Sequence, residues 1–268
     1  MHAGHFKKWS ESSTFMGMFR TTVLRLILAF TLISVNVGCD KDEAPDTGPT
    51  SGNVTIRVTN LVDSLPLQLG QLLYSNAAGN QYEVDMLRYY LTNVTFIKSD
   101  GSSYNTRNYD LVNEEDSASK VITLKGIPNG EYTSIRFLIG IDSTHNNGLD
   151  QTGDLDPIYG MYWYWSTDYI FYKHEGFYMD NGGNLQPMHF HMGTAPSLTT
   201  VSLPASVRLS GNSKTIDLHF DLNASCSYPN VIDFNIDNNH QSTDPSERGW
   251  IDEMRQNISL SFRVASVQ

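Results

Sequence analysis

Two histidines separated by one residue, His189 and His191, are the side chains whose type and spacing point most directly to chemistry. In an extended strand alternate residues share a face, so the two imidazoles would stand on one side with their Cα atoms about 6.6 Å apart. Neutral imidazole is a ligand for copper, zinc, nickel or iron. The spacing therefore predicts a metal site. The alternative is a pair of polar-face histidines on an amphipathic strand, with Phe190 and Met192 turned inward.

A third histidine, His174, lies inside segment 169–175, where alternation places it on the same side as Tyr172. A histidine there could supply a third nitrogen to the same metal ion. It could equally be a surface residue beside its charged neighbours Lys173 and Glu175. Both interpretations remain open at the level of the sequence.

Residues 157–176 are rich in aromatic side chains, including Trp163 and Trp165, five tyrosines and one phenylalanine, against an average of 11% for the chain. Aromatic side chains bury large areas, so one interpretation is a pair of core strands. A second is an exposed stacking platform for a carbohydrate or a peptide. A third, suggested by the histidines downstream, is the wall of a metal pocket.

The segments that must position these residues are short, alternating in hydrophobicity and separated by turns rich in Gly, Asn and Asp. The pattern predicts strands around 54–58, 135–141, 216–222 and 258–264. It allows short helices near 110–119 and 245–255. We therefore expect an all-β fold, an antiparallel β-sandwich with long loops and at most short helices, formed by a single domain over 53–268.

Sequence patterns of common enzymes are missing: the chain has no nucleophile elbow, Walker loop, dinucleotide-binding fingerprint or HExxH. Adjacent carboxylates in a polar loop do not indicate glycoside hydrolysis either. We therefore expect a metal-binding or ligand-binding protein and not an enzyme.

The first 38 residues have the composition of an export signal, with arginines ahead of a short apolar run that ends in Gly38-Cys39. Cys39 is the expected lipidation site of a lipoprotein, which would anchor the protein to a membrane. Residues 39–52 are acidic and rich in Pro, Gly and Ser, as in a flexible tether. The expected location is the cell envelope, as a periplasmic or surface-exposed lipoprotein of the outer membrane.

The chain is acidic, with a formal net charge of −11. Removal of residues 1–38 takes away four basic residues and one acidic residue, so the mature charge becomes −11 − 3 = −14. Nucleic acid is therefore excluded as an expected partner. Cys226 is the only cysteine after Cys39, which rules out a disulfide framework within the domain.

Several motifs follow one another along the chain: 74–79, 87–94, 99–101, 127–132, 136–143, 160–165, 169–176 and 191–193. In these motifs and in their order the chain resembles the MbnP-like family, exported copper-binding proteins named for the partner protein encoded beside methanobactin genes. The branch it resembles is the Bacteroidetes-type lipoprotein branch. Asp168 stands where the family usually has glycine.

The resemblance implies an all-β protein that binds copper and has a dihaem cytochrome c peroxidase-like (MbnH-like) partner, which in relatives oxidises a tryptophan to kynurenine near the metal. On this reading copper is held by His191 and His189, with His174 as a third candidate. Trp163 or Trp165 would be the oxidised residue, and Asp142 would have a structural hydrogen-bonding role near the site. The expected function is copper acquisition, storage or delivery. The alternative is a surface lipoprotein without metal, whose aromatic platform binds a carbohydrate or a peptide.

Overall fold

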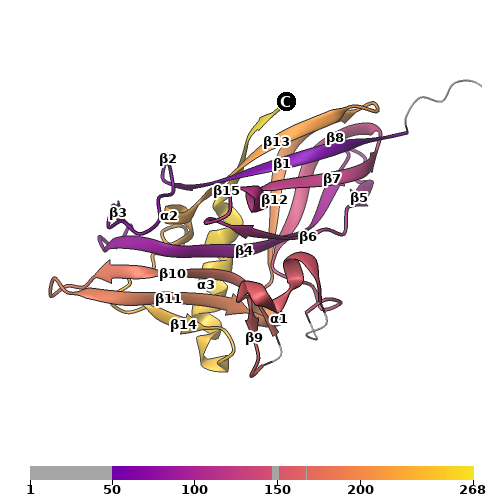
Figure 1. Cartoon of the computed structure of the whole chain (residues 1–268). Coiled ribbons are helices and arrows are strands. Elements are labelled where there is room, and N and C mark those ends of the chain that lie inside the picture. Colours follow the sequence, from indigo (N-terminus) through magenta and orange to yellow (C-terminus); the bar gives the residue numbers. More distant parts are fainter. Residues whose placement is uncertain (1–49, 147–150, 167) are drawn as a thin grey trace, which may run out of the picture. The chain divides into compact units, whose positions relative to one another are not determined.

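The computed structural model describes residues 50–146, 151–166 and 168–268, which form two facing β-sheets with helices packed at one side (Figure 1). The predicted export signal, Cys39 and the tether up to residue 49 lie outside the described residues. The first strand begins at Ser51, so the last two residues of the expected tether belong to the sheet. Within the described residues, no helix is both long and apolar enough to cross a membrane.

The smaller sheet has five strands, with β1 at its centre. Val54, Ile56 and Val58 alternate with polar residues along β1 and are all buried, so one face of this strand packs into the core. Its members are β1 (Ser51–Val62), β2 (Leu65–Pro66), β7 (Val121–Pro128), β13 (Ser213–Asp221) and β15 (Phe262–Val267).

The larger sheet has ten strands and is built along the 17-residue strand β4. Its members are β3 (Tyr74–Ser75), β4 (Gln81–Ile97), β5 (Ser103–Asn105), β6 (Tyr109–Asn113), β8 (Gly130–Ile139), β9 (Tyr162–Trp163), β10 (Asp168–Met179), β11 (Leu185–Gly193), β12 (Thr199–Leu209) and β14 (Asn239–Gln241). Strand β10 lies between β4 and β11 in this sheet and is antiparallel to both.

The fold confirms the predicted all-β sandwich, but the sheets are mixed and not purely antiparallel. Strand β1 pairs with β13 in parallel, and β11 pairs with β14 in parallel. Parallel partners need a long connection, and these pairs are far apart in the sequence. Alternation within one strand carries no information about the direction of its neighbour.

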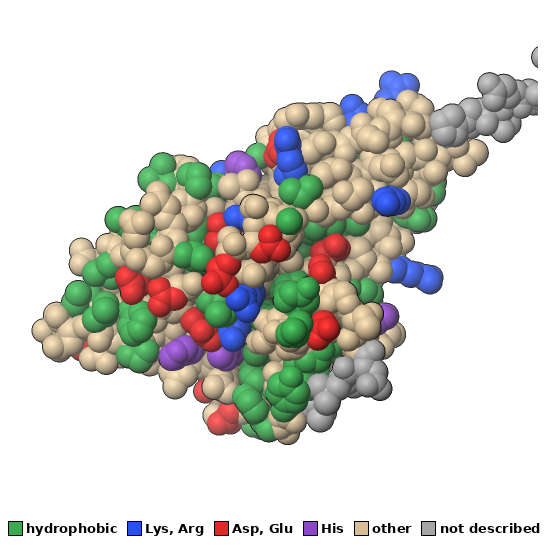
Figure 2. Space-filling view, viewed as in Figure 1, with side chains coloured by type: hydrophobic (Ala, Val, Ile, Leu, Met, Phe, Trp, Pro, Cys, Tyr) green, Lys and Arg blue, Asp and Glu red, His purple; other side chains and the backbone are tan. Residues whose placement is uncertain are grey.

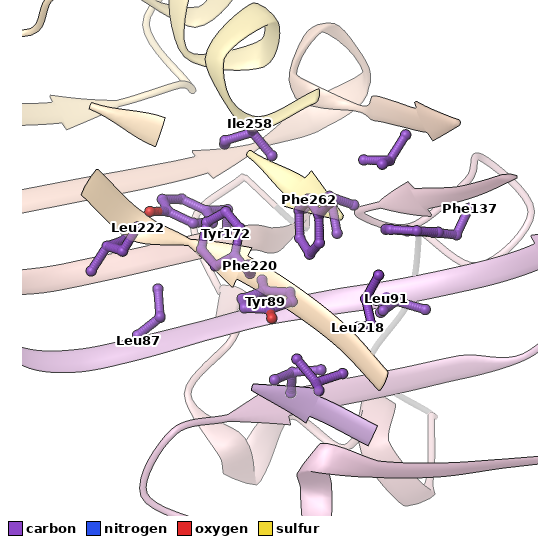
Figure 3. Close-up of a cluster of buried hydrophobic side chains, with 14 of the residues drawn as sticks. Leu87, Tyr89, Leu91, Phe137, Tyr172, Leu218, Phe220, Leu222, Ile258 and Phe262 are labelled. Carbon is purple, nitrogen blue, oxygen red and sulfur yellow. The ribbon is translucent and has the colours of Figure 1, made fainter. Parts of the chain in front are cut away.

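The main core fills the space between the two sheets (Figure 3). Tyr89 of β4 packs edge-on against Phe220 of β13, with ring centres 5.3 Å apart, and Phe220 stacks on Phe262 of β15 at 4.6 Å. Tyr172 of β10 projects into the same cluster. Because aromatic rings bury large areas, these contacts hold β10 firmly against the smaller sheet.

A second, smaller core lies on the other side of β4 and β10, under the loops that precede β10. It contains Tyr90, Leu111, Ile141, Leu155, Met161, Tyr162, Trp163, Tyr169, Ile170 and Phe171. This cluster explains why Tyr169 to Tyr172 are all buried although they alternate in direction. The aromatic segment is therefore partly core, as one interpretation of its composition required.

Three α-helices and four short 3-10 turns complete the part of the chain that the structure describes. They are α1 (Thr194–Ser197), α2 (Leu222–Ser225), α3 (Arg248–Leu260), η1 (Ala118–Lys120), η2 (Gly153–Leu155), η3 (Pro157–Tyr159) and η4 (Pro245–Glu247). The predicted helix near 245–255 is confirmed. It extends to Leu260, so the strand predicted to begin near 258 was wrong over its first residues. The helix expected near 110–119 is instead β6 followed by η1.

Candidate metal site

His189 and His191 stand together on the outer face of β11, the face turned away from the smaller sheet. Their neighbours Phe190 and Met192 are buried in the main core, which fixes the direction of both imidazoles. The two ring centres are 6.2 Å apart. Two imidazoles that bind one ion through nitrogens about 2 Å from it place their ring centres at most about 6.3 Å apart. The distance between the ring centres is therefore within the reach of two imidazoles that share one ion.

His191 has a carboxylate partner, Glu175 of β10, whose Oε1 lies 2.6 Å from its Nε2. The hydrogen bond from His191, together with the charge of Lys173, lowers the pKa of Glu175 to about 2 although partial burial opposes it. An ionised carboxylate can only accept, so Nε2 of His191 carries the hydrogen. Whenever the ring is neutral, its lone pair is therefore on Nδ1. Histidines that bind metals commonly donate their other N–H to a carboxylate in this way.

Lys173 and Arg88 connect this pair to the aromatic loop. The ammonium group of Lys173 lies 3.3 Å from Glu175 Oε1 and donates to the carbonyl of Gly160 at 3.5 Å. Arg88 of β4, which pairs with Lys173 across the sheet, donates to the carbonyl of Tyr159 at 2.9 Å and forms an ion pair with Glu115. The loop before β9 is therefore tied to the same row of charged side chains that orients His191.

Trp163 lies at the end of the row that His189 and His191 form along β11, which we call the histidine row. It is 2% exposed, and a Cβ atom on Gly193 would lie 2.5 Å from its Cζ3. Gly193 follows His191 by two residues on the same extended strand, so its missing side chain would point to the same face as the imidazoles. The ring of Trp163 takes that place. His189, His191 and the Trp163 ring thus follow one another along β11.

Trp165 has the opposite environment, because it is 69% exposed. Its ring centre is 6.2 Å from that of Trp163, and the neighbouring Tyr164 is also exposed. Figure 2 shows histidine side chains beside acidic and basic ones over β10 and β11, with apolar side chains gathered nearby over β9. The aromatic segment therefore has one buried and one accessible tryptophan, so neither a fully buried core nor a fully exposed platform describes it.

His174 does not join the other two histidines. It faces inward from β10, where it is fully buried among the rings of Tyr82, Tyr172 and Phe190. Both ring nitrogens lack a hydrogen-bond partner, and burial lowers its pKa to about 3. The expectation of a third ligand and the alternative of a surface residue are both corrected by this position, because His189 and His191 stand on the opposite face of the sheet.

Asp142, for which a structural hydrogen-bonding role near the site is predicted, accepts its side-chain hydrogen bonds from three residues. It accepts from the side chains of Asn93, Tyr109 and Thr144. Partial burial acts to raise its pKa, and the hydrogen bonds from these three residues outweigh that effect and lower the pKa to about 2. None of these three partners is a histidine of the candidate site or a tryptophan.

Among the described residues, no group of three or more His, Cys, Asp or Glu side chains is arranged to hold a metal ion. The outer face of β11 offers two imidazoles, one of them oriented by Glu175. Sequence reasoning did not assign roles to Glu175, Lys173 or Arg88. Their alternation with the histidine row could have suggested a shared face, but only the strand register places them beside His191.

The comparisons with known proteins decide the family. A sequence model of the family described as MbnP matches residues 51–244, which is most of the chain. The chain belongs to the MbnP family. No curated protein sequence matches it. A solved structure titled "MbnP from Methylosinus trichosporium" is 15% identical, with a TM-score of 0.44, over 64% of this chain and 76% of that chain. The matched range contains both histidines, Glu175, Trp163 and Trp165.

Proposed function

We propose that this MbnP-family protein binds copper through His189 and His191 on the outer face of β11. The observation that carries the proposal is the Glu175–His191 hydrogen bond, which leaves the lone pair of His191 on Nδ1 in a row with a second imidazole. Two imidazoles at this separation would suit Cu(I), which accepts two or three ligands. Structural zinc sites instead take four ligands in a tetrahedral arrangement.

The third donor in this proposal is a product of Trp163, whose ring lies next in the row. Oxidative opening of the indole between C2 and C3 adds two oxygen atoms and gives N-formylkynurenine, and hydrolysis of the formamide by one water releases the C2 carbon as formate and leaves kynurenine with a free aryl amine. The oxidising equivalents would come from a dihaem cytochrome c peroxidase-like partner. The exposed ring of Trp165, 6.2 Å from that of Trp163, is accessible to such a partner.

The role that follows is copper acquisition, storage or delivery in the cell envelope, with Cys39 as the lipid-anchored end of the mature chain. A protein of this kind carries a metal ion and turns over no substrate. The support for this role is membership of the MbnP family and a site whose side chains bind and orient without a nucleophile.

Copper content tests the ligand assignment. Protein expressed in a periplasm with copper should contain about one copper ion per chain. The His189→Ala/His191→Ala variant should contain none, and His145→Ala, which alters an unrelated histidine, should match the unaltered protein. Full copper content in the double variant would refute the site.

Mass spectrometry of the peptide that contains both tryptophans tests the modification separately. Protein from its own host should show replacement of one carbon by one oxygen at Trp163. Unmodified Trp163 in copper-loaded protein from that host would rule out kynurenine as the third donor and leave the histidine assignment standing.

A further inference from the structure

Two adjoining hollows cross the outer face of the larger sheet, away from the histidine row. Their volumes are about 500 Å³ and 630 Å³, within the usual range of ligand sites. Both are lined by Asn93, Asn105 and Asp142, so they form one continuous groove. We call this the β5–β12 groove, because it runs from β5 across β4 and β8 to Thr200 of β12.

The strand register explains why the groove is polar. Thr95 of β4 pairs with Asn105 of β5 on one side and with Arg136 of β8 on the other, which places the three side chains in a row. The neighbouring residues of β4 and β8 point inward into the main core. A register shift lies between Thr92 and Thr95, where Asn93 has a φ of 54°. Few residues other than glycine, asparagine and aspartate tolerate that conformation.

Asp142 forms the fixed centre of the groove. Its side chain accepts hydrogen bonds from Asn93 and Tyr109 on one oxygen and from the backbone and hydroxyl of Thr144 on the other. The ring of Tyr109 lies against that of His145, with centres 4.2 Å apart. These contacts hold an ionised carboxylate in place where the two hollows meet, with the rings of Tyr109 and His145 beside it in one of them.

Two arginines flank the groove and have no partner of their own. Neither Arg107 nor Arg136 forms a side-chain hydrogen bond or an ion pair within the described part of the chain, and both are exposed. The chain as a whole has a net charge of −11, so two arginines beside one groove are a local concentration of positive charge. They favour a ligand that carries negative charge.

The remaining lining consists of amide and hydroxyl side chains spread along the groove. Such groups exchange hydrogen bonds with hydroxyls over a long contact, whereas a phosphate would need donors that converge on one point. We propose that the β5–β12 groove binds an acidic oligosaccharide, with Arg107 and Arg136 pairing with its carboxylates and the Asn and Thr side chains with its hydroxyls. This proposal is independent of the copper function.

Isothermal titration of the full-length protein with oligomers of galacturonate, mannuronate and glucuronate tests the proposal. At least one should bind, and its methyl-esterified form should bind at least tenfold more weakly. Arg107→Gln/Arg136→Gln should also lose at least tenfold in affinity. Arg208→Gln, an exposed arginine paired with Glu131, should leave affinity unchanged, as should the His189→Ala/His191→Ala variant.

The melting temperature of each variant checks folding. Substitution of the two groove arginines should not change it, because neither side chain forms a hydrogen bond or an ion pair within the described residues. Absence of binding to all three acidic sugars would overturn the proposal, as would equal binding by the folded double-arginine variant. Tighter binding of inorganic polyphosphate at the same arginines would also overturn it, by showing that the ligand class is a phosphate.

Discussion

Nε2 of His191 lies 2.6 Å from Oε1 of Glu175, although Glu175 is paired across the sheet with His189. The carboxylate thus reaches its diagonal neighbour on β11, a distance that long side chains span within a sheet. This contact selects the protonated nitrogen of His191. It also connects the histidine row with Lys173 and, through it, with the loop that carries Trp163.

Glu175→Gln should weaken copper binding about 10–100-fold, the range typical of lost partners of metal-binding histidines. The amide can offer its NH₂ to Nε2, which would shift the hydrogen of the imidazole to Nδ1 and remove the lone pair that binds the ion. Competition with a chromophoric Cu(I) chelator measures the affinity. Glu131→Gln, at an exposed ion pair, is the matched control, and an equal loss in both variants would contradict the role of Glu175.

His174 should make the stability of the metal-free protein depend on pH. Its folded pKa is about 3, below the ordinary 6.5, because burial disfavours the charged ring. Between these values the unfolded chain binds more protons than the folded one. The contribution of His174 to the free energy of unfolding is therefore fully present above about pH 6.5. It falls by about 1.4 kcal/mol for each pH unit below that value.

The variant His174→Leu isolates this effect, because the difference between the two proteins cancels the other titrating groups. In urea unfolding, the free energy of unfolding of the variant relative to that of the unaltered protein should rise steadily as the pH is lowered from 6.5 to 4. It should retain copper, since His174 lies on the inner face of β10. Parallel pH profiles for the two proteins would show that His174 is not neutral and buried in the folded state.

Gly193→Ala should disturb the Trp163 pocket. The added methyl group would lie 2.4 Å from the carbonyl oxygen of Tyr169 and 2.5 Å from the Trp163 ring, so one of them must move. We expect a loss of about 1–3 kcal/mol in the free energy of unfolding. Tryptophan fluorescence should change as well. Gly249→Ala, where a methyl group meets nothing within 4 Å in a helix, should be neutral or stabilising.

Arg88→Gln should loosen the loop before β9, because Arg88 donates to the Tyr159 carbonyl and to Asn113 while pairing with Glu115. We expect destabilisation by about 1–3 kcal/mol and faster proteolysis within 157–165. Arg57→Gln removes an exposed ion pair with Asp217 and should cost at most about 1 kcal/mol. Unchanged cleavage of the loop in the Arg88 variant would contradict its anchoring role.

The sequence predicted the shared face of His189 and His191 correctly, because alternation is a local property of a strand and Phe190 and Met192 are apolar. It could not place His174, since alternation assigns a residue to one of two faces but does not say which face is covered. Here both faces of β10 are covered near Tyr169 to Tyr172, by the main core and by the second core.

The wrong strand prediction near residue 258 also comes from tertiary contacts that the local sequence does not show. Ile258 and Leu260 continue an alternating pattern into Phe262, yet the structure places them in α3. Ile258 lies about one helical turn after Met254, and both face the core together with Trp250 and Ile251. The hydrogen bond between Glu175 and His191 depends on strand register, which no local pattern specifies.

Long-range ¹H–¹⁵N spectra of the imidazoles, recorded before and after addition of one equivalent of Cu(I), test most directly whether His189 and His191 share a copper ion. Before addition, Nε2 of His191 should carry a hydrogen. Afterwards, Nδ1 of His191 and one nitrogen of His189 should shift together, while His174 and His240 stay unchanged. Shifts confined to other histidines, or an Nδ1 of His191 that does not respond, would contradict the proposed site.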